Sequence, residues 1–399
     1  LAGLSITHNR VAPDPGVDGN RGGVGSISIP SSDAPFTIPI IDGTAVVTDQ
    51  KLSEVGVFTL TVTTPAYFGE TIAASTSANV GRFYPSHFAL TNGLIIDRID
   101  RVMASACVSN FTYMDEQFEI TYDLIAQNIN DQPTQNYTTT SGFAKLDKTT
   151  EFEYGAAVTS VPQELTPRFS NDGPVFSFIN GAALGITDRL TISRQPTGSP
   201  DGPFLSSVGV SPVESDPGDD GVKLKNFDLD ADGNGINELG LISSTDIYYG
   251  RLLASNTHGS ELTPQTVSLK TQYYDAAIAS FVGNTDDSCT PFNVNDLSAD
   301  NHIDLTLATY TAPLVAANLA MTDSGEFALG NASFVLHDDS IPGAGPDVSG
   351  DVRYQMVAPL YLWYDWDGDN TFTDNPSAKA TFGIFKGNSR QIYYRQIYR

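Results

Sequence analysis

The sequence predicts an all-β protein made of tandem antiparallel β-sandwich domains of the immunoglobulin-like type, joined by long turn-rich loops. Three observations point to this class. Apolar and polar residues alternate with a period of two in several segments, 35 glycines and 23 prolines are spread along the chain, and no helical periodicity lasts for three turns. A strand with this alternation buries one face and exposes the other, as the strands of a sandwich do.

The alternation is clearest in three segments of the chain: 56–64, 118–127 and 267–273. In the first, Phe58 and Leu60 point to one face while Thr59 points to the other, which is the period of a half-buried strand. The weak exception to the strand pattern is 312–321, where Pro313 suits the first turn of a helix. We therefore expect strands almost everywhere.

The C-terminus predicts a β-hairpin. Residues 382–386 and 390–394 flank Gly387 and Asn388, and a glycine at the first central position suits a type II′ turn. The last two strands of the chain are therefore expected to pair with each other.

Length and turn content predict the domain organisation. A chain of 399 residues indicates more than one domain, and the proline- and glycine-rich stretch 195–220 indicates a long connection. Because the chain begins at Leu1, without a methionine or a signal sequence, we read it as a fragment or a processed product. The expected segments are a linker or extended N-terminal segment at 1–24, a small sandwich at 25–85, a sandwich at 86–165, a β-rich domain with an acidic loop at 166–274 and a C-terminal sandwich at 275–399.

The charge of the chain excludes two classes of partner. With 21 Lys and Arg against 47 Asp and Glu, the formal net charge is −26 at pH 7. A nucleic-acid binder needs clustered Lys and Arg to neutralise phosphates, and an anionic membrane surface repels an acidic chain. No apolar run reaches the roughly 18–20 residues that a membrane-spanning helix needs. We expect neither nucleic acid as a partner nor membrane insertion of this part of the protein.

The two cysteines, Cys107 and Cys289, lie far apart in the sequence. No CxxC or Cys–His spacing is present, so a zinc site built on sulfur is not expected. The alternatives are a long-range disulfide and two buried thiols, and the extracellular character of the composition favours the disulfide. A bond that closes so long a loop stabilises a fold by up to ~5 kcal/mol in the chain-entropy model.

The first acidic loop, 228–238, has the spacing of a calcium-binding loop. Oxygen-bearing side chains occupy its positions one, three, five and seven, with Gly233 at six: Asp228, Asp230, Asp232 and Asn234. Position twelve is Leu239 where a calcium loop usually has Glu, so Glu238 at position eleven is the expected substitute. The alternative is a solvated acidic turn, and we favour calcium as the bound ion.

A second acidic loop has the same alternate spacing of carboxylates, and four residues are its candidate calcium ligands: Asp365, Asp367, Asp369 and Asp374. The alternative is a hairpin bend formed by Gly368 and Asn370, with Trp363 and Trp366 packed nearby. A third acidic stretch, 296–304, lacks the repeated spacing and is expected to be a turn.

Signatures of enzymes are missing from the sequence. It contains no G-x-S-x-G elbow, no H-E-x-x-H pair and no phosphate-binding loop, and its five histidines are scattered without the spacing of metal ligands. A pair of carboxylates can hydrolyse glycosides, but a chain with 47 acids offers such pairs by chance. The aromatic residues near the C-terminus would suit sugar rings, although core packing is the favoured interpretation. We therefore expect a non-enzymatic protein without catalytic residues.

Seven segments spread along nearly the whole chain have recognisable sequences: 81–88, 107–114, 249–253, 259–261, 284–290, 364–369 and, as the most specific one, 375–390. In this order they resemble segments of MshQ-like proteins, a family associated with MSHA-type pilus biogenesis. Lys386 and the ending 396–399 depart from the family pattern. The resemblance is to the C-terminal part of large bacterial surface or secreted proteins. It implies an extracellular or cell-surface location and supplies no catalytic residues.

Three functions are compatible with these observations. The expected one is a calcium-stabilised structural or adhesion protein of the bacterial surface, whose partners are pilus or other surface proteins, copies of itself, or surface glycans. The second is a repeating subunit of an extracellular filament assembled by strand exchange, with residues 1–24 as the donor segment. The third is a carbohydrate-binding or carbohydrate-active module, which a cleft with two carboxylates and aromatic walls would favour.

Overall fold

The structure is a computed structural model that describes residues 5–13, 27–28, 51–64, 66, 68–99, 109–158, 165–195, 199–215, 221–292, 294, 302–303, 308–323 and 327–383. Strands make up nearly all the regular structure of these ranges, and no α-helix occurs in them. No helix in the described ranges is long and apolar enough to span a membrane. The predicted all-β class is confirmed.

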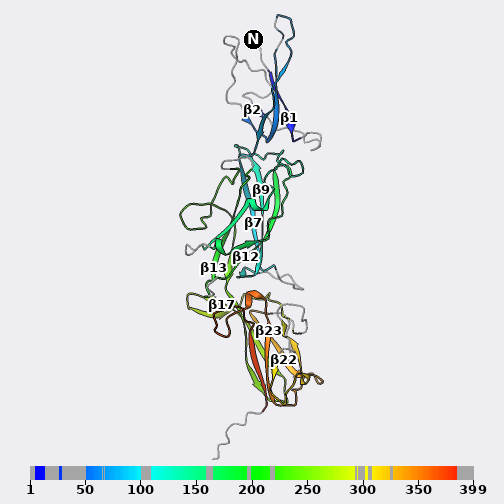
Figure 1. The fold of residues 1–399 in the computed structure, drawn as a ribbon, viewed down its shortest axis with the longest axis vertical. Helices are drawn as coiled ribbons and strands as arrows, with labels where there is room; N and C mark the ends of the chain where they lie inside the picture. Colours follow the sequence, from blue (N-terminus) through cyan, green and yellow to red (C-terminus); the bar gives the residue numbers. More distant parts are fainter. Residues whose placement is uncertain are drawn as a thin grey trace, which may run out of the picture. The chain divides into compact units, whose positions relative to one another are not determined.

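The chain forms two compact units, which are described separately here (Figure 1). Unit 1 consists of Leu1–Ile96, Gln117–Ile192 and Leu205–Thr245. Unit 2 consists of Asp97–Glu116, Ser193–Phe204 and Asp246–Arg399. Each unit is thus assembled from separate stretches of chain, because the chain leaves unit 1 and returns to it twice before it ends in unit 2.

Unit 1 contains a small N-terminal sheet and two larger sheets. In the small sheet, β4 (Gly56–Thr63) pairs with three strands: β1 (Ser5–Ala12), β5 (Ser75–Thr76) and β6 (Val80–Phe83). A separate pair is formed by β2 (Ile27–Ser28) and β3 (Lys51–Leu52). The first larger sheet has the order β11 (Phe169–Asn171), β12 (Ala182–Ile192), β9 (Gln117–Gln127) and β7 (His87–Ile96). The second has the order β10 (Phe152–Val158), β13 (Phe204–Pro212) and β14 (Gly240–Tyr248), and the end of β14 also pairs with β8 (Phe111–Tyr113). Two single-turn 3₁₀ helices, η1 (Thr149–Glu151) and η2 (Thr166–Arg168), complete unit 1.

Strand β9 shows how the sequence positions these sheets. Its residues alternate strictly between buried and half-buried, and every second side chain is fully buried: Phe118, Ile120, Tyr122, Leu124 and Ala126. Antiparallel pairing with β7 and β12 fixes the register on both sides. The period of two read from the sequence is therefore the period of burial in the core.

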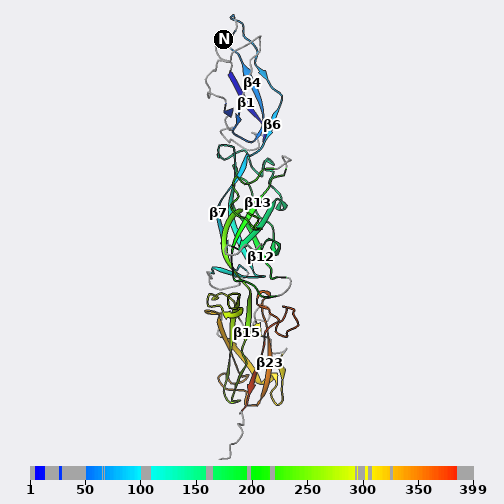
Figure 2. The ribbon, with the colours of Figure 1, turned by 90° about the vertical axis from the view of Figure 1, so that its left-hand side faces the viewer.

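Unit 2 is a sandwich of two sheets with one apolar core. The first sheet has the order β15 (Gly250–Ala254), β17 (Gln265–Asp275), β22 (Asn331–Asp338) and β21 (Leu319–Asp323), and β18 (Ser280–Gly283) also pairs with β17. The second contains β16 (Thr257–Gly259), β24 (Ser377–Phe382), β23 (Gly350–Val357), β19 (His302–Ile303) and β20 (Thr309–Tyr310). Side chains from both sheets, among them Leu252 of β15 and Val352 of β23, lie in the same buried cluster. Figure 2 shows the ribbons of β15 and β23 in this unit. The short 3₁₀ helices η4 (Ala316–Asn318) and η5 (Leu360–Leu362) and strand β8 (Phe111–Tyr113) also belong to this unit.

Some details differ from the sequence-based expectation or lie outside the described residues. The helical turn expected around Pro313 is a single 3₁₀ turn, η4, followed directly by β21. Two pairings are parallel, β8 with the end of β14 and β16 with β24, although most of the sheets are antiparallel as predicted. The predicted C-terminal hairpin at 382–394 lies mostly outside the described residues.

Candidate metal centres

The first acidic loop begins and ends on a short, rigid stem in unit 1. Leu229 and Leu239 form an antiparallel bridge, with Leu229 N–H donating to Leu239 O at 3.0 Å and Leu239 N–H to Leu229 O at 3.2 Å. The same two leucines and Ala231 form a small buried apolar cluster. Backbone pairing and apolar packing together hold the two ends of the loop at a fixed distance.

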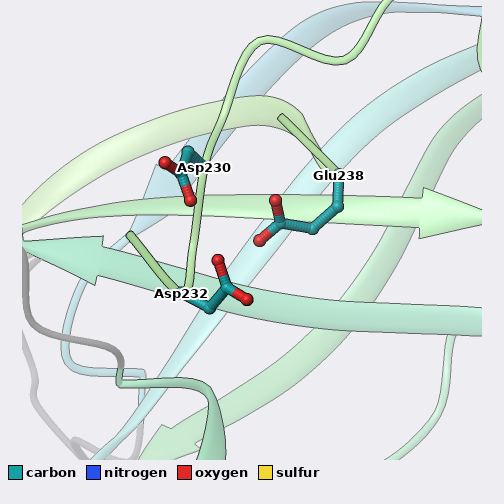
Figure 3. Close-up of side chains that lie close together, drawn as sticks. All are labelled: Asp230, Asp232 and Glu238. Atoms are coloured by element: carbon teal, nitrogen blue, oxygen red, sulfur yellow. The ribbon is translucent and has the colours of Figure 1, made fainter. Parts of the chain in front are cut away.

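Three carboxylates of this loop converge on one point. Asp230, Asp232 and Glu238 each place an oxygen within 4.8 Å of the others, and Figure 3 shows the three side chains turned towards one another. Glu238 accepts a hydrogen bond from Ala231 N–H through Oε1 at 2.7 Å, while its Oε2 is a buried atom with no hydrogen-bond partner among the described residues. Three of the predicted ligands are therefore brought together.

Backbone N–H groups hold these carboxylates in place. Asp230 accepts from Gly233 N–H and from Gly235 N–H, one at each oxygen and both at 2.7 Å. Asp232 accepts from Asn234 N–H at 3.0 Å. Gly233 and Gly235 have φ angles of +73° and +87°, which side-chain-bearing residues rarely adopt, so the glycines allow the turn to close on Asp230. The loop is preformed by its own sequence.

Two of the predicted ligands, Asp228 and Asn234, use their side chains for contacts within the stem and the turn. Asp228 accepts from Leu241 N–H at 2.6 Å and is not part of the converging group, so it belongs to the stem. Asn234 turns its side-chain oxygen to Ile236 N–H at 2.8 Å and donates to Asp232 at 2.7 Å. The converging group therefore begins at Asp230, two residues later than the spacing suggested, and Gly235 is the sixth residue counted from Asp230.

The second acidic loop lies in unit 2 and repeats this construction. Asp365, Asp367 and Asp374 each place an oxygen within 4.8 Å of the others. Tyr364 and Asp374 form the antiparallel bridge that closes the stem, with N–H to O distances of 3.2 and 3.1 Å. Asp369 accepts from Thr371, through the backbone N–H at 2.7 Å and the hydroxyl at 2.6 Å, and is not in the converging group.

The hydrogen bonds of the two loops correspond residue by residue. Asp365, like Asp230, accepts from the N–H groups three and five residues later, at 2.7 and 3.1 Å. Asp367, like Asp232, accepts from the N–H group two residues later, at 3.1 Å. Asp374, like Glu238, accepts from the residue between the first two carboxylates, here Trp366, at 3.0 Å. One sequence pattern has produced the same loop in both units.

Hydrogen bonds favour the ionised form of one carboxyl in each loop. Desolvation opposes ionisation of Asp230, but hydrogen bonds from Gly235 and Gly233 outweigh it and lower the pKa of this carboxyl. Hydrogen bonds from Thr371 lower the pKa of Asp369. Each loop thus gathers negative charge that a cation can neutralise. All converging ligand atoms are carboxylate oxygens, the donors that Ca²⁺ and Mg²⁺ prefer, whereas zinc sites use nitrogen and sulfur as well.

Aromatic rings and an arginine surround the second loop. The ring of Trp366 lies 5.3 Å from that of Tyr364, and the Arg251 guanidinium lies 3.7 Å from the Phe281 ring centre and 5.1 Å from that of Trp366. Trp363, the other tryptophan, donates through Nε1 to Ala358 O at 2.7 Å and packs against the core of unit 2. Nothing in the sequence spacing pointed to Arg251, which lies in β15.

The predicted disulfide is only half covered by the described residues. Cys289 is fully buried in unit 2, and Cys107 lies outside the described residues. On the described side, Arg98 donates to Asp287 at 2.7 Å and to Thr290 at 2.9 Å, two residues close to Cys289. The Cys107–Cys289 bond stays a prediction, and it would lie within unit 2.

Two grooves of unit 1 adjoin the first loop. One, of about 300 Å³, is lined by residues of β7 and by Asp131, Lys225 and Asp228; the other, of about 530 Å³, is lined by Glu153, Lys223, Phe227 and Glu238 among others. The second groove contains two carboxylates, the feature that would favour glycoside chemistry. Glu238 is turned to the metal group, however, and Phe227 is the one aromatic residue of the lining. The C-terminal tyrosines that would suit sugar rings, although core packing is the favoured interpretation, are Tyr393, Tyr394 and Tyr398, and they lie outside the described residues.

Comparison with known proteins identifies two domains. Residues 54–238 match the third domain of DUF6701, and residues 248–397 match the fourth domain of DUF6701. No curated protein matches the sequence. Among solved structures, the crystal structure of the CupB6 tip adhesin from Pseudomonas aeruginosa is matched with 9% identity over 75% of this chain and 100% of that one, at a TM-score of 0.15, too low for any inference. The chain therefore belongs to the DUF6701 family and contains its third and fourth domains in that order.

Proposed function

We propose that this chain is a non-enzymatic structural or adhesion protein of the bacterial surface, linked to pili as in MshQ-like proteins, and that Ca²⁺ bound at the two acidic loops stabilises its sandwiches. The observation that carries the proposal is the loop itself. Among the residues that the structure describes, the same arrangement, with three converging carboxylates on a closed stem, is found once in each unit. Ionised carboxylates repel one another unless a cation lies between them, so a turn that only faces solvent gives no reason for three of them to converge.

Calcium suits these loops better than magnesium. Ca²⁺ accepts six to eight oxygens in flexible geometry. Each loop offers three carboxylates, and backbone carbonyls or waters usually complete such a shell. Mg²⁺ demands near-ideal octahedral geometry and keeps several waters, so dedicated protein cages rarely select it. An ion that binds only the folded chain adds stability, about 2.7 kcal/mol when its concentration is 100 times the Kd.

The composition supports a surface location and a non-catalytic role. The net charge of −26 keeps such a chain soluble and repels nucleic acid and anionic lipid. Backbone N–H groups donate to the carboxylates of its acidic loops. Such fixed carboxylates suit a site that holds an ion, whereas a catalytic acid or base must exchange protons with a substrate. Partners of the proposed protein are pilus or other surface proteins.

The filament alternative would need a different pairing of the N-terminus. β1 lies within the segment 1–24 and pairs with β4 of the same chain over Ser5–Ala12. Strand exchange would therefore require β1 to leave β4 and to pair with the β4 of a neighbour. A monomer at all concentrations in analytical ultracentrifugation would exclude this alternative, and an open-ended series of oligomers would support it.

The calcium proposal is tested by thermal unfolding of the full chain with chelator and with added Ca²⁺. We expect Ca²⁺ to raise the midpoint of both units, and direct metal analysis of the dialysed protein to find two ions per chain. Mg²⁺ at the same concentration should have a smaller effect. Equal midpoints with chelator and with Ca²⁺, and no bound ion, would contradict the proposal.

A further inference from the structure

Unit 2 contains a buried group of charged side chains that the sequence did not predict. Arg98, Glu116 and Asp287 are all completely buried. Arg98 donates through Nε to both oxygens of Glu116 at 3.1 Å, through Nη1 to Asp287 at 2.7 Å and through Nη2 to Thr290 Oγ1 at 2.9 Å. Its guanidinium also lies 4.9 Å from the ring centres of Phe111 and Tyr113. We call these three charged residues the Arg98 group.

The Arg98 group holds one particular segment of the chain. Asp97–Glu116 is the stretch that leaves unit 1 after β7 and returns to it before β9. Arg98 and Glu116 lie at the two ends of this stretch, and Asp287 comes from the loop after β18 in the body of unit 2. The group therefore joins the two described ends of this stretch, residues 97–99 and 109–116, to the loop after β18 within unit 2. We propose that it is a proton-operated switch: uptake of one proton strengthens the attachment of these two ends to the rest of unit 2, and release of that proton weakens it.

The charge balance of the group is the first argument. One arginine faces two carboxylates, so the group carries a net charge of −1 when both are ionised. The phenol of Tyr361 also faces Glu116, and the phenol of Tyr113 donates to Asp287; burial raises the pKa of each tyrosine, so both stay neutral. An uncompensated charge in a fully buried site is unfavourable, and a single proton removes it.

The hydrogen bonds decide which carboxylate takes the proton. Asp287 accepts from Arg98, from the hydroxyls of Tyr113 and Thr290 at 2.9 and 2.5 Å, and from the N–H groups of Cys289 and Thr290 at 3.2 and 3.0 Å. Burial opposes its ionisation, but Arg98 and these hydrogen bonds outweigh burial and lower the pKa of Asp287. Burial dominates at Glu116 and raises its pKa to about 7, against the opposing effect of Arg98.

The consequence for stability has a definite sign. The pKa of Glu116 is higher in the folded chain than the ordinary 4.5, so the folded chain binds more protons than the unfolded chain between about pH 4.5 and about pH 7. Stability of unit 2 therefore rises as the pH falls through this window and decreases as it climbs. The unfolding equilibrium constant changes by at most about tenfold per pH unit, the limit for one proton.

The test is urea unfolding of the full chain, followed by tryptophan fluorescence with chelator present throughout. Trp363 and Trp366 are the only tryptophans and both lie in unit 2, so the signal reports this unit. We expect the wild-type unfolding constant to rise by at least tenfold from about pH 5 to about pH 8. Glu116→Gln mimics the protonated form, and Asp287→Asn removes the competing charge. Both variants should flatten the profile, while the exposed control Asp339→Asn should keep the wild-type slope.

A second measurement follows the segment itself. Hydrogen exchange of amides 109–116, corrected for intrinsic rates, should show higher protection at pH 5 than at pH 8 in the wild type and no difference in Glu116→Gln. The proposal is overturned if wild type and Glu116→Gln share the same pH profile, or if Glu116→Gln is destabilised equally at every pH. Because chelator is present, neither result depends on whether the acidic loops bind calcium.

Discussion

The backbone N–H of Trp366 donates to Oδ2 of Asp374 at 3.0 Å, which joins a tryptophan to the last converging carboxylate of the second acidic loop. Trp366 also stands in sequence between the other two converging residues, Asp365 and Asp367. Its ring lies beside Tyr364 and Arg251. If a cation binds the three carboxylates as proposed, we expect it to change the surroundings of the indole.

Addition of Ca²⁺ to the chelated protein is expected to change the intensity or the emission maximum of tryptophan fluorescence with a saturating dependence. Asp367→Asn should abolish the change, because it removes one of three charged ligands. The matched control is Asp232→Asn, the equivalent residue of the first loop, which should leave the fluorescence titration intact because no tryptophan lies in unit 1. A titration unaffected by Asp367→Asn would assign the signal to another site.

The first loop is tested by hydrogen exchange over residues 229–239. We expect Ca²⁺ to slow exchange in the wild type and Asp232→Asn to remove this effect, because Asp232 is in the converging group. Asp228→Asn is the informative control, since Asp228 accepts from Leu241 N–H and an amide oxygen can do the same. Loss of calcium protection in Asp228→Asn as well would mean that the loop begins at Asp228, as its spacing had suggested.

Arg194 is expected to be a major source of stability in unit 2. It donates to three carbonyl groups, those of Trp363, Gly250 and Tyr361 at 2.7, 2.9 and 2.6 Å, and lies 4.4 Å from the ring centre of Tyr249. Arg194→Lys keeps the charge, but an ammonium group cannot reproduce the planar set of N–H donors of a guanidinium. Each buried carbonyl that loses its donor costs about 1–3 kcal/mol in the free energy of unfolding. We expect a loss of about 2–4 kcal/mol in urea unfolding. The exposed Arg189→Lys is the control, and an equal effect in both variants would contradict this role.

Much of the fold was predictable because its signal is local. The alternation around Phe118 and Tyr122 is the burial pattern of β9, and a period of two has few other structural solutions. The acidic loops were predictable for the same reason, as the spacing of their carboxylates is short. The first residue of the first loop was harder to predict. A run of alternate carboxylates can be counted from Asp228 or from Asp230, and the bridge between Leu229 and Leu239 places Asp228 in the stem and Asp230 in the loop.

The Arg98 group could not be predicted from the sequence. Arg98 and Asp287 are 189 residues apart, and no repeat, spacing or periodicity connects them. Their contact depends on a topology in which one stretch of chain leaves unit 1 and returns to it, whereas the sequence suggests domains that follow one another. Long-range ion pairs of this kind become visible only when the fold is known.

The same contact makes the Cys107–Cys289 bond testable in a specific form. Because Arg98 already holds Asp97–Glu116 against Asp287 and Thr290, a disulfide there closes a loop that the fold has brought together. We expect non-reduced protein to lack free thiols after unfolding, and reduction to lower stability by up to ~5 kcal/mol. Cys107→Ser, Cys289→Ser and the double variant should be equally destabilised, because one bond is lost in each. Additive losses, or two reactive thiols in the unfolded non-reduced chain, would show that the cysteines act as separate buried side chains.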